Sequence, residues 1–338
     1  MNESIPKPKI ICITPIKNES WILDRFLKCA SLWADHIIIA DQSSDDGSRD
    51  IAIRYPKVIL IDNQSQSFNE PERQQLLIEE ARKIPGQRIL IALDADEILT
   101  ANFNLSPEWN TVLNSPPGTV IRTQVANIRP DMCAYWAPPY NLPFGFIDDG
   151  SEHTGSKIHS TRIPYRINAP TIILKDIKIL HYQYSDWDRM KSKHRWYQVW
   201  ERLNNPKRSS IDIYRQYHHM DVISPNEIHF IPKDWFCGYI NQNIDITSVN
   251  IKGIYWWDKD VLSQLAKHGI GKFKREAIWD VDWSSLNNII NSNHSDLYLC
   301  DPRNKFEKYI HRWIRRTQSD ASKLKVRIIE RILKFFGW

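Results

Sequence analysis

The sequence has few of the features that mark membrane, secreted or zinc-binding proteins. No run of about 18 apolar residues occurs, so no segment predicts a transmembrane helix. The first nine residues contain no apolar core, and we expect no signal peptide. The five cysteines are scattered and form no CxxC pair. This pattern argues against a disulfide framework or a structural zinc site and favours a reducing compartment, so we expect a cytoplasmic protein.

The net positive charge of the chain comes from its end. The net charge is +5, but residues 303–338 carry 11 Lys and Arg against 3 Asp and Glu. The preceding part of the chain is therefore slightly acidic. A basic tail on an acidic body does not predict nucleic-acid binding by the whole protein.

The first hundred residues alternate between strand and helix patterns. Strands are expected at 10–14, 36–40, 58–61 and 89–93, and helices after residue 18, at 50–55 and at 70–83. Further strands are expected within 119–128 and 171–182, and a helix at 185–203. This alternation predicts an α/β protein with a mostly parallel sheet and right-handed crossovers.

The fourth expected strand runs directly into two carboxylates. In Arg88-Ile-Leu-Ile-Ala-Leu-Asp-Ala-Asp-Glu97, Asp94 and Asp96 fall just past the strand's carboxyl end, where ligands bind in open α/β sheets. Side chains two positions apart on an extended segment point the same way. Two oxygen ligands can thus face one divalent cation that carries a diphosphate. The pattern predicts a nucleotide-processing enzyme.

Together with this motif, two others resemble the inverting family 2 glycosyltransferases. Residues 13–19, Ile-Thr-Pro-Ile-Lys-Asn-Glu, match the turn after that family's first strand, and residues 41–48, Asp-Gln-Ser-Ser-Asp-Asp-Gly-Ser, match the run after its second. The resemblance covers about residues 8–180. It implies the GT-A fold, which is Rossmann-like with a mostly parallel sheet and flanking helices. It also implies metal-dependent transfer, with inversion, from a nucleoside-diphosphate sugar to a glycan or glycolipid acceptor in cell-surface polysaccharide biosynthesis.

The resemblance assigns roles to individual residues. Thr14, Asp41 and Asp94 match positions that bind the nucleotide sugar, and Asp94 and Asp96 match those that bind the metal-bound diphosphate. Gln42 departs from the family's second Asp, which leaves the nucleotide undefined. The Gln-x-x-Arg-Trp signature of processive synthases is missing, since 192–196 keeps only Arg-Trp. A non-processive enzyme is therefore implied.

Inverting transfer also needs a general base for the acceptor hydroxyl. The candidates Asp148, Asp149 and Glu152 lie in a loop flanked by aromatic residues, 144–153, whose glycines would allow it to close over the donor. The alternative for this loop is a plain acidic surface turn. Asp186 and Asp188 come next, although carboxylates before a helix also stabilise its dipole.

A histidine completes the expected metal site. His181 ends an apolar stretch, and this resemblance places such a residue near the metal or diphosphate. Imidazole suits Mn²⁺ better than Mg²⁺, so the expected cofactor is a divalent cation, Mn²⁺ or Mg²⁺. A structural histidine is the alternative. Four basic residues are further candidates for phosphate contact: Lys157, Arg162, Arg166 and Arg195.

Three segments are expected along the chain: a catalytic domain at 1–183, a helix-rich acceptor-side extension at 184–300 and a basic amphipathic helix within 301–338. From about residue 322 the helix pairs a broad apolar arc with a cationic one, which predicts peripheral contact with anionic membrane on the inner face of the cytoplasmic membrane. The alternative is packing of that arc on protein.

Two other functions stay open for the whole chain. It could be an inactive membrane-docking scaffold, or a phosphatase that uses the Asp-x-Asp pair.

Overall fold

The chain forms two compact units in a computed structural model that describes residues 7–65, 69–156, 160–250, 253–290 and 299–338. Unit 1 comprises Met1–Asp186 and Glu227–Ile251, and unit 2 comprises Trp187–Asn226 and Lys252–Trp338. Both units therefore consist of two separate stretches of sequence. The expected boundary near residue 183 is close to the first of these transitions, but the return to unit 1 was not foreseen. The basic tail belongs to unit 2.

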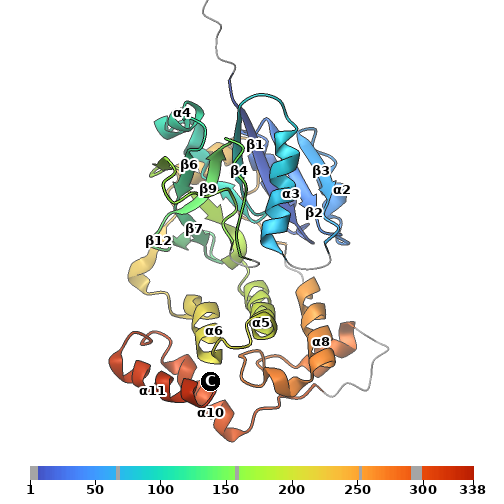
Figure 1. Ribbon diagram of the computed structural model, residues 1–338, viewed down its shortest axis with the longest axis vertical. Coiled ribbons are helices and arrows are strands. Elements are labelled where there is room, and N and C mark those ends of the chain that lie inside the picture. The colour runs from blue at the N-terminus through green and yellow to red at the C-terminus, as the bar shows by residue number, and fades with distance from the viewer. Residues whose placement is uncertain (1–6, 66–68, 157–159, 251–252, 291–298) are drawn as a thin grey trace, which may run out of the picture. The chain divides into compact units, whose positions relative to one another are not determined.

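Unit 1 is built on a seven-stranded sheet with the order β10-β6-β9-β4-β1-β2-β3 (Figure 1). The strands are β1 (Lys9–Ile16), β2 (His36–Asp41), β3 (Val58–Asp62), β4 (Arg88–Ala92), β6 (Val120–Thr123), β9 (Leu142–Ile147) and β10 (Thr171–Ile173). Strands β1 to β4 pair in parallel, as do β6 and β10. Only β9 among the described strands of this sheet runs antiparallel to its neighbours, β4 and β6. The expected mostly parallel α/β sheet is confirmed.

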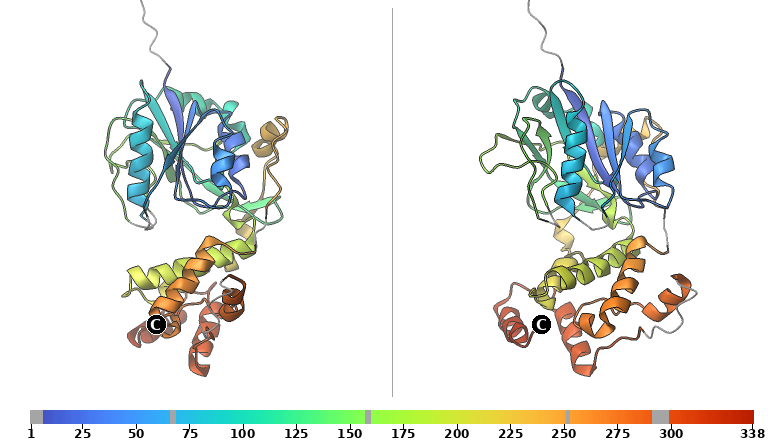
Figure 2. Two further views of the ribbon diagram at one scale, coloured as in Figure 1. Left: turned by 90° about the vertical axis from the view of Figure 1, so that its right-hand side faces the viewer. Right: turned by 45° about the vertical axis from the view of Figure 1, so that its right-hand side comes forward.

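Helices cover both faces of this sheet. Ile11 and Ile13 of β1 pack with Leu77 and Ile78 of α3 (Glu70–Arg82) in one apolar cluster. The alternate β1 positions pack in a second cluster with α1 (Leu23–Ala30) and with Ala52 of α2 (Ser48–Ala52). Figure 2 shows α3, in cyan, and the blue helices α1 and α2 on opposite sides of the sheet. The two-residue period of a strand thus places its apolar side chains in two separate layers.

A smaller sheet extends unit 1, with the order β12-β8-β7-β11-β5. Its strands are β5 (Glu97–Leu99), β7 (Val125–Ile128), β8 (Ala134–Trp136), β11 (Ile179–His181) and β12 (Ile228–Phe230). The expected single strand within 119–128 is two strands, β6 and β7, one in each sheet. Helix α4 (Pro107–Leu113) and the returning helix α7 (Asp234–Ile240) complete the unit. The Tyr239 hydroxyl of α7 donates to the Leu99 carbonyl oxygen at 2.8 Å and so ties the return to β5.

Unit 2 is helical in its described part. Its helices are α5 (Trp187–Asn204), α6 (Ser210–Tyr217), α8 (Trp256–His268), α9 (Trp283–Ile290), α10 (Lys305–Arg316) and α11 (Leu324–Phe335). Helices α5 and α8 are joined by a buried polar contact, in which the Ser192 hydroxyl bonds the Asp258 carboxylate and accepts from Trp257 Nε1 at 2.9 Å. The expected helix-rich carboxyl-terminal region is confirmed.

The direction of β9 decides where the loop at 144–153 lies. Ile147 of β9 pairs with Ile89, and the Asp148 N–H donates to the Arg88 carbonyl oxygen at 3.0 Å, at the start of β4. Asp94 and Asp96 lie beyond the other end of β4. Asp148 therefore lies at the edge of the sheet opposite to Asp94, because an antiparallel strand delivers its carboxyl end to that edge.

Asp148 is instead a structural ion-pair partner. Its side chain is fully buried, and its oxygens accept from Arg82 Nη2 and Arg88 Nε at 2.9 Å each. Burial alone would raise the pKa of Asp148, but the hydrogen bonds from Arg82, the Gly150 N–H and Arg88 outweigh it and hold the pKa below its ordinary value. A carboxylate kept ionised in this way anchors the loop to β4 and α3.

Replacing Asp148 by Asn should lower the free energy of unfolding by about 2–4 kcal/mol at pH 7, because it leaves two partly buried guanidiniums unmatched. A lowered pKa means that the stabilisation is complete above the ordinary carboxyl value near 3.9 and is lost as the pH falls through the lowered pKa. The difference between wild type and Asp148→Asn in urea unfolding should accordingly shrink at pH 3.

The neighbouring carboxylate provides the control for this experiment. Asp149 is more exposed than Asp148, and its Oδ2 lies 3.6 Å from Nη1 of the largely exposed Arg166. Asp149→Asn should therefore change the free energy of unfolding by less than about 1 kcal/mol. Equal losses for the two variants, or a loss that does not depend on pH, would contradict a structural role for Asp148.

Candidate functional site

The carboxyl ends of the central parallel strands meet at one edge of the unit 1 sheet. Ile16 of β1 lies beside Asp41 of β2, and Asp41 lies beside Asp62 of β3. Asp94 follows β4, which pairs with the other side of β1. This is the edge at which open α/β sheets bind ligands. The sheet therefore brings carboxylates from three strands to one binding edge.

The two loops that carry the first two sequence motifs are hydrogen-bonded to each other. Asn18 Nδ2 donates to Asp45 Oδ1 at 2.8 Å, and the Asp45 N–H donates to Asn18 Oδ1 at 2.9 Å. The Glu19 N–H donates to Ser48 Oγ at 2.9 Å. A helix was expected directly after residue 18, but Asn18 has a left-handed φ of 58° and α1 begins later, at Leu23. Several motif residues thus hold the two loops together, and this structural role accounts for their presence without a ligand.

Asp41 lies at the centre of this edge and is held by an arginine. Arg49 Nη1 donates to Asp41 Oδ2 and to Asp62 Oδ1, at 2.7 Å each. The Asp41 side chain is fully buried beneath Arg49, and these bonds raise the pKa of the Arg49 guanidinium above its ordinary value. A nucleotide could reach the Asp41 carboxylate only by displacing or sharing Arg49.

The Asp-x-Asp motif forms a tight turn that is closed by Glu97. The Asp94 N–H donates to Glu97 Oε2 at 3.0 Å, and the Glu97 N–H donates to the Asp94 carbonyl oxygen at 2.9 Å. Arg162 binds both carboxylates: Nη1 bonds Glu97, and Nη2 donates to Asp94 Oδ2 at 2.8 Å. Burial alone would lower the pKa of Arg162, but Asp94 and Glu97 raise it far above its ordinary value. Arg162 therefore supplies a permanent positive charge beside Asp94.

Asp96 faces the histidine predicted from the sequence. Strand β11 pairs with β5 so that His181 lies beside Glu97, and the Tyr182 N–H donates to the Asp96 carbonyl oxygen at 2.8 Å. His181 Nε2 lies 3.7 Å from Asp96 Oδ1, while His181 Nδ1 is 3.0 Å from Asn127 Oδ1. An amide oxygen only accepts, so Nδ1 carries the hydrogen and Nε2 is the atom turned to Asp96.

These residues fit a cation that is held by two protein ligands. The 3.7 Å between Asp96 Oδ1 and His181 Nε2 is too long for a hydrogen bond. It slightly exceeds the roughly 3.0–3.4 Å expected between neighbouring ligands of a metal with bonds near 2.1 Å. Asn127 orients the imidazole, as the outer partners of metal ligands commonly do. Among the described residues no group of three or more His, Cys, Asp or Glu side chains is placed to hold a metal, so the remaining ligands would be phosphate oxygens and water.

Thr14 of the first motif and Gln42 of the second are buried and have contacts within the protein. Thr14 is fully buried within β1, with its hydroxyl 3.7 Å from the Cys12 thiol. Gln42, which departs from the family pattern, donates from Nε2 to the Ser65 carbonyl oxygen at 2.8 Å. The structure therefore places Thr14 in the core beneath the edge and leaves Asp41, Asp94 and Asp96 along it.

The remaining predicted residues lie in other surroundings. Arg166 is near Asp149 at the opposite edge of the sheet, and Arg195 of unit 2 binds Asp280. Glu152 is exposed and lies in the same loop as Asp149, 144–153. Lys157 lies outside the described residues. Of the predicted phosphate-binding residues, the structure brings Arg162 to the Asp94 turn.

Of the carboxylates predicted as the base, Asp186 lies on the segment that continues from His181. It is 7% exposed and comes immediately after the turn Tyr182–Tyr184 and Ser185, which continue from His181. Asp188, two residues on, is largely exposed and pairs with Lys191 at 3.0 Å. Asp186 thus lies on the segment that the Tyr182–Asp96 hydrogen bond ties to the motif turn.

Three residues of the site were not found from the sequence: Arg49, Glu97 and Asn127. Glu97 directly follows the motif, and in the sequence it looks like one more acidic residue of that run. Arg49 belongs to α2 and Asn127 to β7, and only the folded unit brings them to Asp41 and His181. No local pattern marks such partners.

Comparison with known proteins identifies no family for this chain. No family model matches, and no curated protein matches. Among solved structures, similar chains include a 4-diphosphocytidyl-2C-methyl-D-erythritol synthase (14% identity, TM-score 0.22) and a mannose-1-phosphate geranyltransferase from Thermus thermophilus (18%, 0.27). A third is a mannose-6-phosphate isomerase from Helicobacter pylori (15%, 0.27).

These likenesses are partial. They cover 28%, 42% and 42% of this chain and 48%, 51% and 62% of the three solved chains, in the same order. TM-scores this low support no inference about the activity of this chain, which must come from its own residues.

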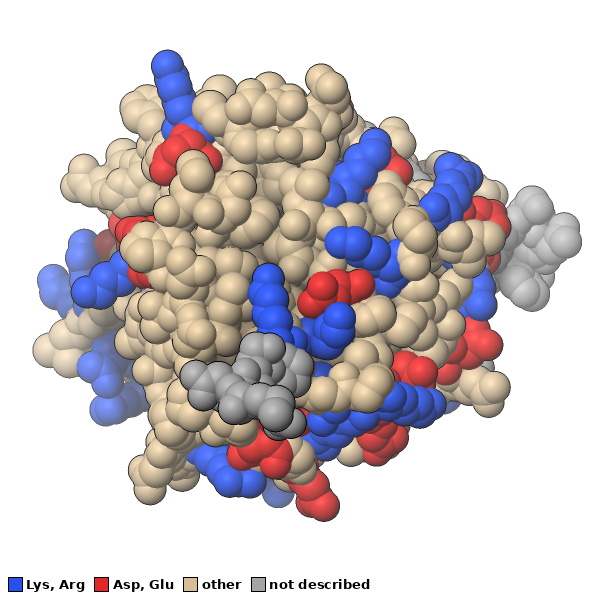
Figure 3. Space-filling model, turned by 90° about the horizontal axis from the view of Figure 1, so that it is seen from above, with Lys and Arg blue, Asp and Glu red and all other residues tan. Residues whose placement is uncertain are grey.

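Two surface findings bear on partners. None of the described helices is long and apolar enough to cross a bilayer. On the face seen in Figure 3, Lys and Arg are intermixed with Asp and Glu. Mixed signs do not produce the continuous positive field on which nucleic-acid binding depends.

Proposed function

We propose that this chain is a metal-dependent, non-processive glycosyltransferase. It moves a sugar from a nucleoside-diphosphate sugar to a glycan or glycolipid acceptor with inversion, in cell-surface polysaccharide biosynthesis. The observation that carries the proposal is the Asp94–Glu97 turn at the carboxyl edge of a parallel sheet, where β11 brings His181 within 3.7 Å of Asp96. Glycan chemistry and acceptor rest on the resemblance of three motifs in the sequence.

Each residue of the edge has a task in such a reaction. Asp96 and His181 would hold the divalent cation, which when bound neutralises charge on the diphosphate leaving group. Arg162 adds a fixed positive charge beside Asp94, and Arg49 does so beside Asp41. Both guanidiniums can turn from a carboxylate to a phosphate, because they present several donors in a planar fork. Asp186 would accept the proton of the acceptor hydroxyl.

One observation favours a second candidate, the inactive scaffold. Asp41 and Asp94, both expected to bind the donor, are already occupied by Arg49 and Arg162. If these ion pairs did not open, no nucleotide could bind between the carboxylates. The phosphatase alternative gains no such support, since the motif follows β4 and continues into the buried Glu97.

A thermal-shift screen against UDP-, GDP- and dTDP-sugars should find a donor that stabilises the protein in Mn²⁺ and not in EDTA. At one hundred times its dissociation constant, a ligand stabilises by about 2.7 kcal/mol. Asp96→Ala should abolish this stabilisation and sugar-nucleotide hydrolysis. Asp94→Ala should weaken both less, because Asp96 and His181 remain.

Asp149→Ala is the matched control, since it removes a carboxylate at the opposite edge of the same sheet. It should bind donor like the wild type. No Mn²⁺-dependent shift with any donor would favour the scaffold, and near-normal hydrolysis by Asp96→Ala would refute the metal assignment.

The base is tested with amide variants, which keep the shape of the side chain and remove its basicity. Asp186→Asn should lower transfer by about 10²-fold or more while donor binding is preserved. Asp188→Asn, Asp149→Asn and Glu152→Gln should transfer at nearly the wild-type rate. A large loss in Glu152→Gln with an active Asp186→Asn would instead return the base to the 144–153 loop.

The carboxyl-terminal helix is proposed to contact anionic membrane. One side of α11 is docked within unit 2, where Leu333 packs beside Ile314 and Trp338 and Glu330 binds Arg215 at 2.8 Å. The helix and its end nevertheless expose six large apolar side chains: Leu324, Ile328, Ile329, Ile332, Phe335 and Phe336. The expected arc is therefore divided between protein and solvent. An exposed apolar row beside Lys and Arg matches the headgroup boundary of an anionic bilayer.

Ile332→Ser with Phe335→Ser should reduce co-sedimentation of the full chain with phosphatidylglycerol vesicles at least tenfold, because each buried apolar side chain contributes about 1.5–3 kcal/mol. Ile53→Ser with Leu105→Ser, which removes exposed apolar side chains of unit 1, should leave binding unchanged. Equal binding by both variants would refute the membrane contact. Concentration-dependent dimerisation without vesicle binding would assign the row to a second copy.

A further inference from the structure

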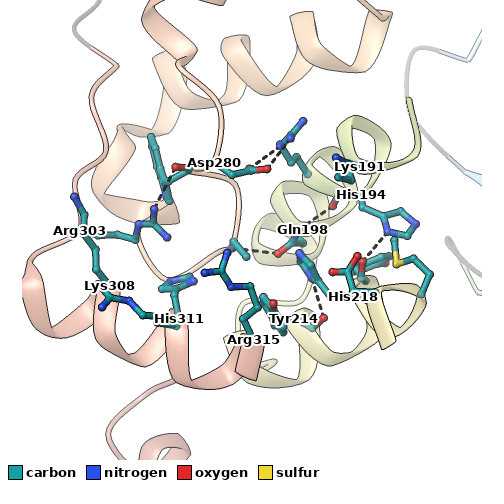
Figure 4. Close-up of a pocket in the computed structure, with 17 residues that line it drawn as sticks. Lys191, His194, Gln198, Tyr214, His218, Asp280, Arg303, Lys308, His311 and Arg315 are labelled. Atoms are coloured by element: carbon teal, nitrogen blue, oxygen red, sulfur yellow. Dashed lines mark hydrogen bonds and ion pairs between the residues drawn. The ribbon is translucent and has the colours of Figure 1, made fainter. Parts of the chain in front are cut away.

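Unit 2 contains a cavity of about 500 Å³ that the proposed reaction does not use. Its walls come from α5, α6 and α10 and from the segment 277–280, all within unit 2 (Figure 4). Pockets that bind small molecules commonly measure about 300–1,000 Å³. The cavity is therefore large enough for a sugar or a nucleotide.

The lining of this cavity is strongly basic. Six Lys and Arg side chains line it, against two Asp: Lys191, Arg195, Arg303, Lys308, Arg312 and Arg315, with Asp221 and Asp280. Three histidines and the aromatic rings of Tyr214, Tyr217 and Trp279 form much of the remainder. Cations that converge on one concave surface raise the local concentration of anions.

Part of this positive charge is not neutralised by the protein. Arg195 is matched by Asp280, with oxygen contacts at 2.8 and 2.7 Å, and Arg303 and Lys308 share Asp301. Arg312 and Arg315 form no ion pair with any carboxylate in the described part of the chain. Both belong to α10 and line the cavity. Both side chains are exposed to solvent, so an anion in the cavity could bind them without first breaking an ion pair.

A buried histidine provides independent support. His311 is 8% exposed, and neither ring nitrogen has a hydrogen-bond partner in the described structure. Burial, together with the positive charge of Arg303, lowers the pKa of His311 to about 4, although the nearby Lys274 backbone favours the charged ring. Figure 4 shows the ring among the cavity residues, next to Arg315 and Lys308. Buried polar atoms are rarely left unpaired.

We propose that this cavity binds a phosphate-bearing ligand of sugar or nucleotide size. Arg312 and Arg315 bind the phosphate oxygens by charge-assisted hydrogen bonds, and the neutral ring of His311 donates one more. Tyr214, which stacks on His218, and Trp279 form the apolar part of the cavity wall. The site is separate from the Asp94 edge in unit 1 and does not depend on the proposed transferase activity.

The probe is inorganic pyrophosphate, measured by calorimetry on the full chain in EDTA at constant ionic strength. EDTA removes the divalent cation that the unit 1 edge needs for a diphosphate, so binding reports on the basic cavity. Arg312→Gln with Arg315→Gln should weaken binding at least tenfold, and His311→Phe should weaken it severalfold. Glucose 1-phosphate should bind and glucose should not.

Matched controls separate the cavity from general surface charge. Arg316→Gln with Arg331→Gln removes the same charge from exposed positions outside the cavity and should change binding less than twofold. Arg312→Lys with Arg315→Lys should retain most of the affinity. Circular dichroism and thermal unfolding would show that each variant is folded.

Three outcomes would overturn the proposal: no binding by the wild type, equal weakening by the two Gln pairs, or loss of binding in Arg49→Gln, which would place the anion at the unit 1 edge. Failure of the transferase experiments would leave this result unchanged, since the two sites are tested under different conditions.

Discussion

A carboxylate that is almost fully removed from water has to be matched by positive charge, and the Asp94–Glu97 turn depends on one such group, Glu97. Its oxygens accept from the Asp94 N–H and from Arg162, so the same side chain closes the motif turn and attracts a guanidinium to it. Strand β5 begins at Glu97 and pairs with β11, which delivers His181. The positions of Asp94, Asp96 and His181 therefore depend on one buried pair, and removal of a partner from such a pair is strongly destabilising.

The sequence allowed the parallel half of the fold to be predicted because each strand there carries its own signal. Apolar runs such as 89–93 end in polar residues, and parallel strands necessarily collect those ends at one edge. The direction of β9 carried no comparable signal. It is set by pairing with β4 and β6, and it moves Asp148 and Asp149 to the far edge. The sequence of a loop rich in acidic residues and glycine does not indicate at which edge of the sheet the loop lies.

The site was predictable in part for the same reason. Asp41, Asp94 and Asp96 follow strands and could be placed from their positions in the sequence. Their partners could not: Arg49 reaches Asp41 across a turn, and Asn127 reaches His181 from another strand. The amphipathic tail illustrates a further limit. Periodicity identified the apolar arc of α11 but could not divide it into Leu333, which packs, and Phe335, which is exposed.

The return of residues 227–251 to unit 1 has a consequence for how the chain is made. Three hydrogen bonds tie this segment to earlier parts of the unit: Tyr239 to Leu99, Arg25 to Asp245 and Tyr182 to Ile246. During synthesis, the amino-terminal sheet cannot acquire these contacts until the first helices of unit 2 have left the ribosome. A gene fragment that stops after β11 would encode an unfinished unit 1. Neither unit is thus a contiguous module that recombination could transfer to another protein with a single crossover.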